Sequence, residues 1–222
     1  MISKEGLRQL IEHSGISLDS ATANQLQTYL ALLEKWNTRV NLTSSTEWSR
    51  LEPLFQEGIS ASQLYHIGPA AHLDIGSGAG FPAMLLRILR PKIQLDLVES
   101  RIKKCAFLET LVDSLKMDAA EVHRMRLRTY LQSCGKVWDC VTWKAIKLNS
   151  RDLAELLVHS HQLTQFWMFH GKQLAVEEPE MMERDFNLVR SEILDSHRSW
   201  KLSIYLPRHA FHVKQSPTII RA

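Results

Sequence analysis

The sequence predicts an α/β fold with a mostly parallel sheet, and three observations lead to this class. First, the stretch from His72 to Leu86 reads as a strand, a glycine-rich turn and the start of a helix. Second, an apolar run ends in an acidic residue, Glu99, as a second parallel strand would. Third, apolar runs and amphipathic segments continue to alternate after it, which is typical of a parallel sheet.

The turn after the first strand contains three glycines at alternate positions, Gly76, Gly78 and Gly80. Glycine tolerates positive φ and has no Cβ, so the backbone can approach a ligand closely. Pro82 suits the first position of the following helix, whose free N–H groups face the loop. Phe81 stands where a dinucleotide-binding loop has its third glycine, which disfavours NAD and FAD.

Glu99 lies 23 positions after Gly76, close to where nucleotide-binding folds place an acidic residue that bonds ribose hydroxyls. The glycine loop and Glu99 together predict a nucleoside site. The alternative is an ordinary tight turn followed by an exposed glutamate at a strand end.

The spacing Asp-x-Gly-x-Gly-x-Gly resembles motif I of class I S-adenosylmethionine-dependent methyltransferases. This resemblance implies a Rossmann-like fold and S-adenosyl-L-methionine as cofactor. The cofactor-binding residues that follow from the motif, or from the strand after it, are Asp74, Gly76, Gly78, Gly80, Phe81 and Glu99.

Composition is that of a globular protein: 45% of the 222 residues are hydrophobic and 23% are charged. The length fits one α/β domain with an extension, or two small domains. No signal peptide or run of 18 apolar residues is present, so we expect a cytoplasmic protein without a membrane segment. The three cysteines have no Cys-x-x-Cys spacing, and we expect neither a disulfide framework nor a metal site. A net charge of +3 permits nucleic-acid binding.

Residues 1–66 are predicted to form an N-terminal helical cap, and residues 67–222 the Rossmann-like domain. A short helix over 4–14 ends at Gly15. Ser17, Asp19 or Ser20 begins the next helix, which carries an apolar stripe at steps of three and four. A helical connector covers 47–66, with Gly58 as its weak point.

The second helix ends in Trp-Asn-x-x-x-Asn-Leu-Thr, from Trp36 to Thr43, about thirty residues before the glycine loop. This order resembles the bacterial small-subunit (16S) ribosomal RNA guanine-N7 methyltransferases, also called glucose-inhibited division protein B, up to about Gly171. Members usually carry Arg-His-x-x-Asp-Ser in the connector, whereas this chain has Phe-Gln-Glu-Gly-Ile-Ser-Ala-Ser over 55–62.

Further elements alternate along the chain. Helices are predicted over 82–90, 101–116, 152–161 and 177–190, and strands over 94–98, 121–125, 137–145 and 165–170. An antiparallel strand pair, 200–206 with 210–214, is predicted to turn around Pro207 and Arg208.

The resemblance also implies two sets of contacts at later strand ends. The junction after the third strand covers the adenine in the family, which implies cofactor contacts for Leu127 and Arg128. The fourth strand ends in Trp-Lys-Ala where the family usually has Ser-Arg-Ala, so Lys144 takes the basic position without the bidentate fork of arginine. The alternative for Lys144 is a solvated strand cap.

Ribosomal RNA, or the small ribosomal subunit, is the expected partner. The substrate-binding residues expected around the cleft are Arg39, Asn41, Lys103, Arg124 and Arg126. Lys103 is equally compatible with simple solvation. Trp48 or Phe81 is expected to stack on a base, and both are equally good core residues.

Guanine N7 carries a lone pair and no proton, so methyl transfer to it needs no general base, and no catalytic acid or base is expected. We expect a monomeric RNA methyltransferase of this kind. The alternatives are a diverged member that binds cofactor or ribosomal RNA without methyl transfer, or an enzyme that methylates another RNA or a small molecule.

Overall fold

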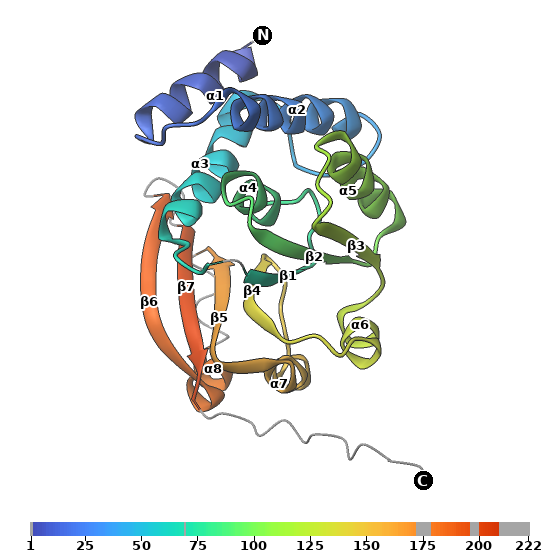
Figure 1. Cartoon of the computed structure of the whole chain (residues 1–222), viewed down its shortest axis with the longest axis vertical. Helices are drawn as coiled ribbons and strands as arrows, with labels where there is room; N and C mark the ends of the chain where they lie inside the picture. Colours follow the sequence, from blue (N-terminus) through green and yellow to red (C-terminus); the bar gives the residue numbers. More distant parts are fainter. Residues whose placement is uncertain (1, 69, 172–178, 196–199, 209–222) are drawn as a thin grey trace.

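The structure is a computed structural model, and it describes residues 2–68, 70–171, 179–195 and 200–208 (Figure 1). Helices and strands alternate through the middle of the chain, as predicted. The helices are α1 (Ile2–His13), α2 (Ser20–Asn37), α3 (Trp48–Leu64), α4 (Ala83–Leu89), α5 (Ile102–Ser114), α6 (Leu127–Ser133), α7 (Ser150–Val158) and α8 (Pro179–Asp185).

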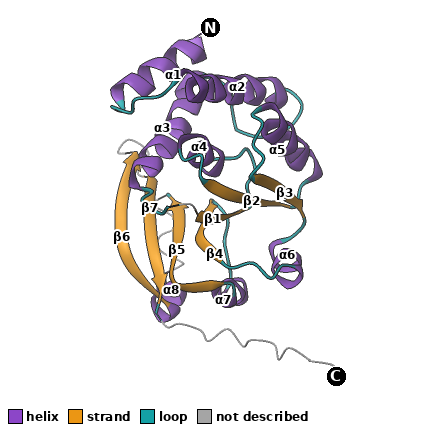
Figure 2. Cartoon of the chain, viewed as in Figure 1, coloured by secondary structure: helices purple, strands orange, loops and turns teal. Residues whose placement is uncertain are grey.

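The strands form a single sheet in the order β3-β2-β1-β4-β5-β7-β6 (Figure 2). Strands β1 to β5 pair in parallel, and β7 is antiparallel to both of its neighbours. This confirms the predicted α/β class with a mostly parallel sheet. The strands are β1 (Ala70–Ile75), β2 (Ile93–Glu99), β3 (Ala120–Arg124), β4 (Trp138–Lys144), β5 (Ser160–His170), β6 (Phe186–Asp195) and β7 (Trp200–Pro207).

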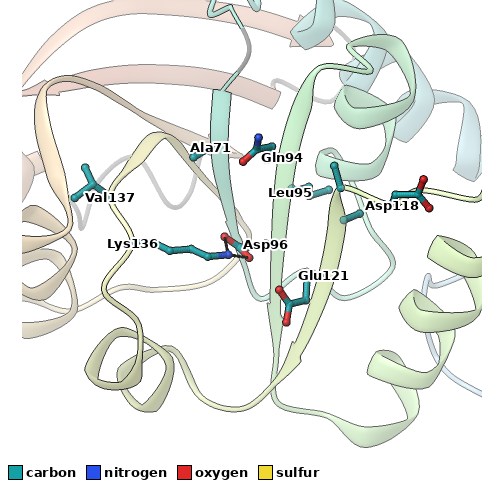
Figure 3. Close-up of a pocket in the computed structure, with 10 residues that line it drawn as sticks. Ala71, Gln94, Leu95, Asp96, Asp118, Glu121, Lys136 and Val137 are labelled. Atoms are coloured by element: carbon teal, nitrogen blue, oxygen red, sulfur yellow. Dashed lines mark hydrogen bonds and ion pairs between the residues drawn. The ribbon is translucent and has the colours of Figure 1, made fainter.

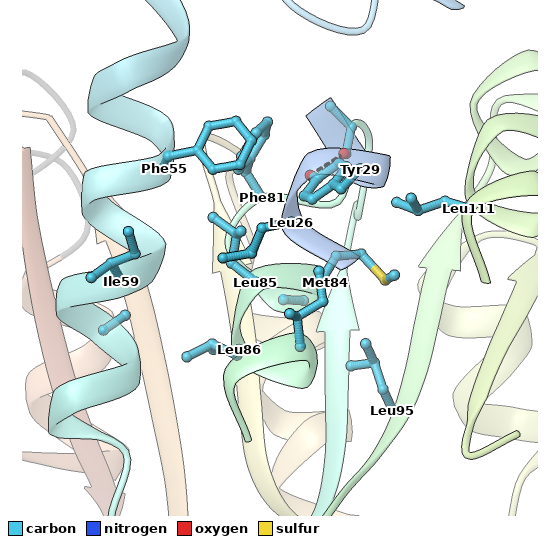
Figure 4. Close-up of a cluster of buried hydrophobic side chains, with 14 of the residues drawn as sticks. Leu26, Tyr29, Phe55, Ile59, Phe81, Met84, Leu85, Leu86, Leu95 and Leu111 are labelled. Carbon is cyan, nitrogen blue, oxygen red and sulfur yellow. Dashed lines mark hydrogen bonds between the residues drawn. The ribbon is translucent and has the colours of Figure 1, made fainter. Parts of the chain in front are cut away.

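Each face of the sheet is covered by its own hydrophobic core. The larger core contains side chains of α1 to α5, and Figure 4 shows its centre, where Tyr29, Phe55 and Phe81 meet above Leu85. The smaller core contains side chains of α6 and α7 on the opposite face. Alternate strand residues enter different cores, as the two-residue period of a strand requires: Leu97 belongs to the larger one and Val98 to the smaller.

Helix α2 begins where capping chemistry places it. Asp19 is the N-cap of α2, and its Oδ1 accepts a hydrogen bond from the Thr22 backbone N–H at 2.7 Å. Gly58 does not interrupt α3; it is buried and allows α3 to pack against Leu85 of α4. Pro82 is the N-cap of α4 and not its first helical residue, a shift of one position.

The C-terminal part corrects one prediction. The helix expected over 177–190 is only the short α8, because Phe186 begins β6, which pairs antiparallel with β7. Charged residues along this segment suggested a solvated helix; the segment is indeed mostly exposed between Phe186 and Leu194, but its backbone pairs with β7 as a strand. The strand expected over 200–206 is confirmed as β7, and 210–214 lies outside the described residues.

The N-terminal helices contact the glycine loop directly. Tyr29 of α2 is fully buried, and its hydroxyl donates a hydrogen bond to the Ala79 carbonyl at 2.6 Å. A buried hydroxyl needs such a partner, so this bond ties α2 to the turn after β1. The division into a cap over 1–66 and a core over 67–222 stays a prediction.

Candidate functional site

The glycine loop lies at the carboxyl end of β1, in the middle of the sheet. Gly76 and Gly78 have φ values of +69° and +56°, which side chains rarely adopt. The Gly76 N–H donates to the Val98 carbonyl of β2 at 2.8 Å. A Cβ on Gly76 would lie 3.1 Å from Ile146, so the loop and the segment after β4 approach each other closely.

Glu99 ends β2 beside this loop, and 7% of it is exposed. Its Oε2 accepts a hydrogen bond from the Gly78 N–H at 3.1 Å, and its Oε1 accepts one from the Arg101 N–H at 2.8 Å. The sequence spacing therefore corresponds to a real contact between the acidic strand end and the glycine loop.

Asp74 is buried at the end of β1. The Thr142 hydroxyl donates to Asp74 Oδ1 at 2.6 Å, while Oδ2 has no hydrogen-bond partner among the described residues. Burial, with a further contribution from the Glu99 charge, raises the pKa of Asp74 to about 7. Thr142 also contacts His72 Nε2 at 3.0 Å, and burial lowers the pKa of His72 to about 3, so the imidazole is neutral.

Lys144, at the end of β4, is enclosed by two side chains from distant parts of the chain. Both carboxylate oxygens of Glu57 in α3 lie 2.7 Å from its Nζ. The Nζ also lies over the Trp200 ring, 4.8 Å from the centroid. Two places where the sequence departs from the pattern expected of the family, the 55–62 segment and Lys144, thus contact each other as an ion pair.

The glycine loop, Glu99, Lys144 and Trp200 line one cavity of about 750 Å³. It combines the glycine loop, apolar side chains and a basic rim in which Glu99 is the acidic member. The lining residues are Leu42, Thr43, Ser44, Arg50, Leu54, Gly76, Ser77, Gly78, Ala79, Phe81, Glu99, Ser100, Arg101, Lys104, Lys144, Ala145, Ile146 and Trp200.

Gly80 lies where the loop packs against Met84 of α4 and Tyr29 of α2. Its φ is +88°, and a Cβ would lie 2.7 Å from Met84 Cγ and 3.1 Å from the Tyr29 hydroxyl. Phe81 lines the cavity but is mostly enclosed by aromatic rings, with centroids 5.2 Å from Tyr29 and 5.3 Å from Phe55. Both positions therefore also hold the loop in place.

Leu127 and Arg128 begin α6 and are not among the residues that line this cavity. The Arg128 guanidinium donates from Nε to Asp152 at 2.8 Å and from Nη2 to Asn149 at 3.1 Å, both at the start of α7. Their role in cofactor binding stays a prediction.

The expected substrate-binding residues lie on the surface. Lys103 is exposed on α5, whereas its neighbour Lys104 lines the cavity together with Arg101. This follows from the helix period, because residues three apart share a face. All five expected residues, Arg39, Asn41, Lys103, Arg124 and Arg126, are exposed and outside the cavity lining.

The sequence did not single out several residues that the fold brings to the site. Thr142 pairs with Asp74 across β1 and β4, a neighbour relation that the register of the sheet creates. Lys104 could have been recognised from its spacing, because it lies three residues after Arg101 and so on the same side of α5. Glu57 and Trp200 come from α3 and β7, and no local pattern links them to the glycine loop.

A second cavity, of about 500 Å³, lies near the amino ends of β1 to β4 (Figure 3). Ligands in open α/β sheets bind at the opposite, carboxyl edge. Asp96, Glu121 and His123 gather there, but Lys136 Nζ lies 2.8 and 3.0 Å from the two Asp96 oxygens and already supplies a cation. We assign no ligand to this cavity.

Comparison with known proteins decides the family. The model of the family described as rRNA small subunit methyltransferase G matches residues 22–197. The chain belongs to this family. A ribosomal RNA small subunit methyltransferase G from Roseiflexus sp. is 34% identical over 164 residues, which cover 72% of this chain and 67% of that protein. One from Streptococcus gordonii is 28% identical, over 85% of this chain and 81% of the relative.

Solved structures confirm the methyltransferase fold. A fibrillarin/Nop5p complex matches 71% of this chain and 84% of that chain, with a TM-score of 0.58 and 14% identity. A ribosomal protein L11 methylase from Lactobacillus delbrueckii matches 70% and 79%, with a TM-score of 0.56 and 14% identity. The predicted family, a methyltransferase with S-adenosylmethionine as its cofactor, and the class I fold are thereby confirmed at the level of the family.

Among the described helices, none is both long and apolar enough to span a membrane.

Proposed function

We propose that this chain transfers a methyl group from S-adenosylmethionine to N7 of a guanosine in small-subunit ribosomal RNA. The observation that carries the proposal is the hydrogen bond between Gly78 and Glu99 at the carboxyl edge of the sheet, in a chain of the rRNA small subunit methyltransferase G family. This edge is where α/β folds bind nucleotides.

The residues around the cavity fit the cofactor. Gly76 and Gly78 leave the backbone open to a ligand, and the Glu99 carboxylate has the acceptor atoms that ribose hydroxyls require. The buried Oδ2 of Asp74, at the end of β1, has no hydrogen-bond partner among the described residues and offers a polar atom close to the loop. The residues proposed to hold the cofactor are Asp74, Gly76, Gly78, Gly80, Phe81, Glu99, Leu127, Arg128 and Lys144.

S-adenosylmethionine supplies an activated methyl group on a sulfonium. The protein then has to position the guanine, exclude water and tolerate positive charge beside the reacting atoms. Glu57 compensates the ammonium of Lys144, so this basic side chain adds little net charge near the proposed sulfonium position. N7 needs no deprotonation, so no side chain has to act as a general base.

Ribosomal RNA would approach the basic rim of the cavity. Arg50, Arg101 and Lys104 line it, and outer contacts come from the predicted residues Arg39, Asn41, Lys103, Arg124 and Arg126. Lysine and arginine contacts to phosphates supply affinity. We further propose that the chain acts as a monomer in the cytoplasm.

The test is incubation of the purified protein with radiolabelled S-adenosylmethionine and small ribosomal subunits that lack the modification. We expect label in the ribosomal RNA, at guanine N7 after nuclease digestion. Gly78→Asp should abolish both labelling and cofactor binding by calorimetry, because it adds a side chain and a negative charge beside Glu99 at positive φ.

The same experiment decides between the alternatives. Cofactor binding without any incorporation would indicate a diverged member that only binds. Label in another RNA, or in a small molecule, would indicate a different substrate. Wild-type protein that does not bind the cofactor would overturn the assignment of the cavity.

A further inference from the structure

Trp200 is an aromatic side chain that the sequence did not connect with the site. It is the first residue of β7, is partly exposed and lines the same cavity as the glycine loop. Because β7 runs antiparallel to β5, its first residues lie at the carboxyl edge of β5: Lys201 pairs with His170, the last residue of that strand. The ring therefore stands at the edge where ligands bind.

The sheet order separates Trp200 from the proposed cofactor contacts. Glu99 ends β2, next to β1, whereas β7 is separated from β1 by β4 and β5. The side of the cavity nearer β2 contains Glu99 and the glycine loop, which would hold the nucleoside. Trp200 forms part of the other side, next to Lys144, where a second reactant has to enter.

The other aromatic candidates are already occupied by core packing. Phe81 is only 8% exposed and packs against Tyr29 and Phe55. Trp48 packs against Phe55, with ring centroids 6.0 Å apart, and does not line the cavity. Of the two aromatic side chains among the described residues that line the cavity, Trp200 is thus the more exposed one.

The surroundings of Trp200 hold its ring in place and suit a flat base. Lys144 Nζ lies over one face of the ring, and the Glu57 carboxylate holds that ammonium as an ion pair. A cation over an aromatic ring is attractive, so the pair holds the ring without a covalent link. The apolar side chains of Leu54 and Ile146 lie in the same lining.

We propose that Trp200 is the platform on which the target guanine stacks, which makes it a substrate-binding residue of the proposed methyl transfer. Base–aromatic stacking is favourable for any base, so Trp200 supplies affinity for the extruded purine, and other contacts supply sequence selectivity. The proposal rests on the RNA methyltransferase function proposed above.

The test compares Trp200→Ala with Trp200→Phe and Lys201→Ala. Lys201 is the next residue on β7, so its side chain points to the opposite face of the sheet, and it does not line the cavity. For Trp200→Ala we expect KM for the small subunit to rise about tenfold to a hundredfold, with the Kd for S-adenosylmethionine unchanged within twofold. Trp200→Phe should retain most of the affinity, and Lys201→Ala should behave like the wild type.

A parallel measurement keeps this proposal separate from the proposed function. Affinity for unmodified ribosomal RNA is measured with S-adenosylhomocysteine at saturation, which needs no turnover. If wild-type protein binds this RNA but transfers no methyl group, the proposed reaction fails while stacking is still tested. An unchanged RNA affinity in Trp200→Ala, or a loss of cofactor affinity in a variant with normal thermal unfolding, would overturn the role of Trp200.

Discussion

Lys144 places an ammonium group next to a pocket proposed to receive a sulfonium, and its charge is compensated within the protein. Glu57, in the middle of α3, is 2% exposed and holds Lys144 with both oxygens. A buried pair of this kind contributes little net stability, but removing one partner leaves an uncompensated charge. Its functional value would be the local charge balance.

Glu57→Gln should therefore weaken binding of S-adenosylmethionine more than binding of S-adenosylhomocysteine, whose sulfur is neutral. The unbalanced ammonium of Lys144 would repel the sulfonium by about 1–2 kcal/mol, about five- to thirtyfold in relative Kd. Calorimetry with both ligands measures the ratio. The double variant Glu57→Gln with Lys144→Gln removes both charges and should restore the wild-type ratio of the two Kd values. A ratio that remains altered in the double variant would contradict the charge argument.

Asp74 predicts a pH dependence of stability. Its pKa is about 7 when folded and near 4 when unfolded, so the folded state binds the extra proton between these values. The stability that this proton contributes is fully present below about pH 4 and is lost as pH rises through about 7. Asp74→Asn keeps an acceptor for Thr142 and has no proton to lose over this range. The free energy of unfolding of the variant, relative to that of the wild type, should therefore rise by about 2–4 kcal/mol from pH 5 to pH 8. Urea unfolding of both proteins at pH 5 and pH 8 measures this change. The same difference in free energy of unfolding at the two pH values would refute the prediction.

At the residue scale, a site residue could be predicted from the sequence when it lay close to the glycine loop along the chain. Gly76, Gly78 and Glu99 were recognisable because strand, loop and strand end follow one another within one local motif. Glu57 and Trp200 were not, because only the packing of α3 and the return of β7 bring them to the site. Lys103 was preferred over Lys104 because composition does not show which side of a helix faces a cavity.

At the scale of elements, the contact between α3 and α4 depends on the absence of a side chain. A Cβ on Gly58 would lie 2.7 Å from Leu85 Cβ, so the two helices would have to separate. Gly58→Ala should destabilise the fold by about 1–3 kcal/mol, although alanine favours a helix more than glycine does. Chemical denaturation measures the change. The matched control is Gly135→Ala, where nothing lies within 4 Å and we expect a change below about 0.5 kcal/mol.

The same scale explains why β6 was predicted as part of a helix. Strand β6 carries apolar residues among charged ones, and Leu188, Val189 and Ile193 are exposed. The run of charges therefore resembled a solvated helix. Hydrogen bonding to β7 determines the strand instead, and that pairing is a tertiary contact with no local signal.

At the scale of the whole molecule, a small net charge conceals a local basic rim. The chain carries a net charge of +3, while Arg50, Arg101, Lys104 and Lys144 all line one cavity. Of these, Lys144 is paired with Glu57, which leaves the other three cations for phosphate contacts in the described part of the chain. The fold itself was predictable because alternating strands and helices allow few arrangements.

Lys104→Ala should lower the affinity for ribosomal RNA and reduce the magnitude of the salt dependence, the slope of log K against log salt, by about one. Lys103→Ala, one residue away on the exposed side of α5, removes the same charge outside the cavity and should have a smaller effect. Filter binding between low and moderate salt, with S-adenosylhomocysteine present, measures both. Equal slopes in the two variants would place the RNA outside the cavity.

The bond from the Tyr29 hydroxyl to the Ala79 carbonyl has a practical consequence for anyone who shortens the protein. A fragment that starts at residue 67 would retain every glycine of the turn but would lack α2, whose Tyr29 forms this hydrogen bond. In such a fragment the turn should be cleaved faster by proteases than in the whole chain. Adding residues 1–66 as a separate peptide should slow that cleavage again.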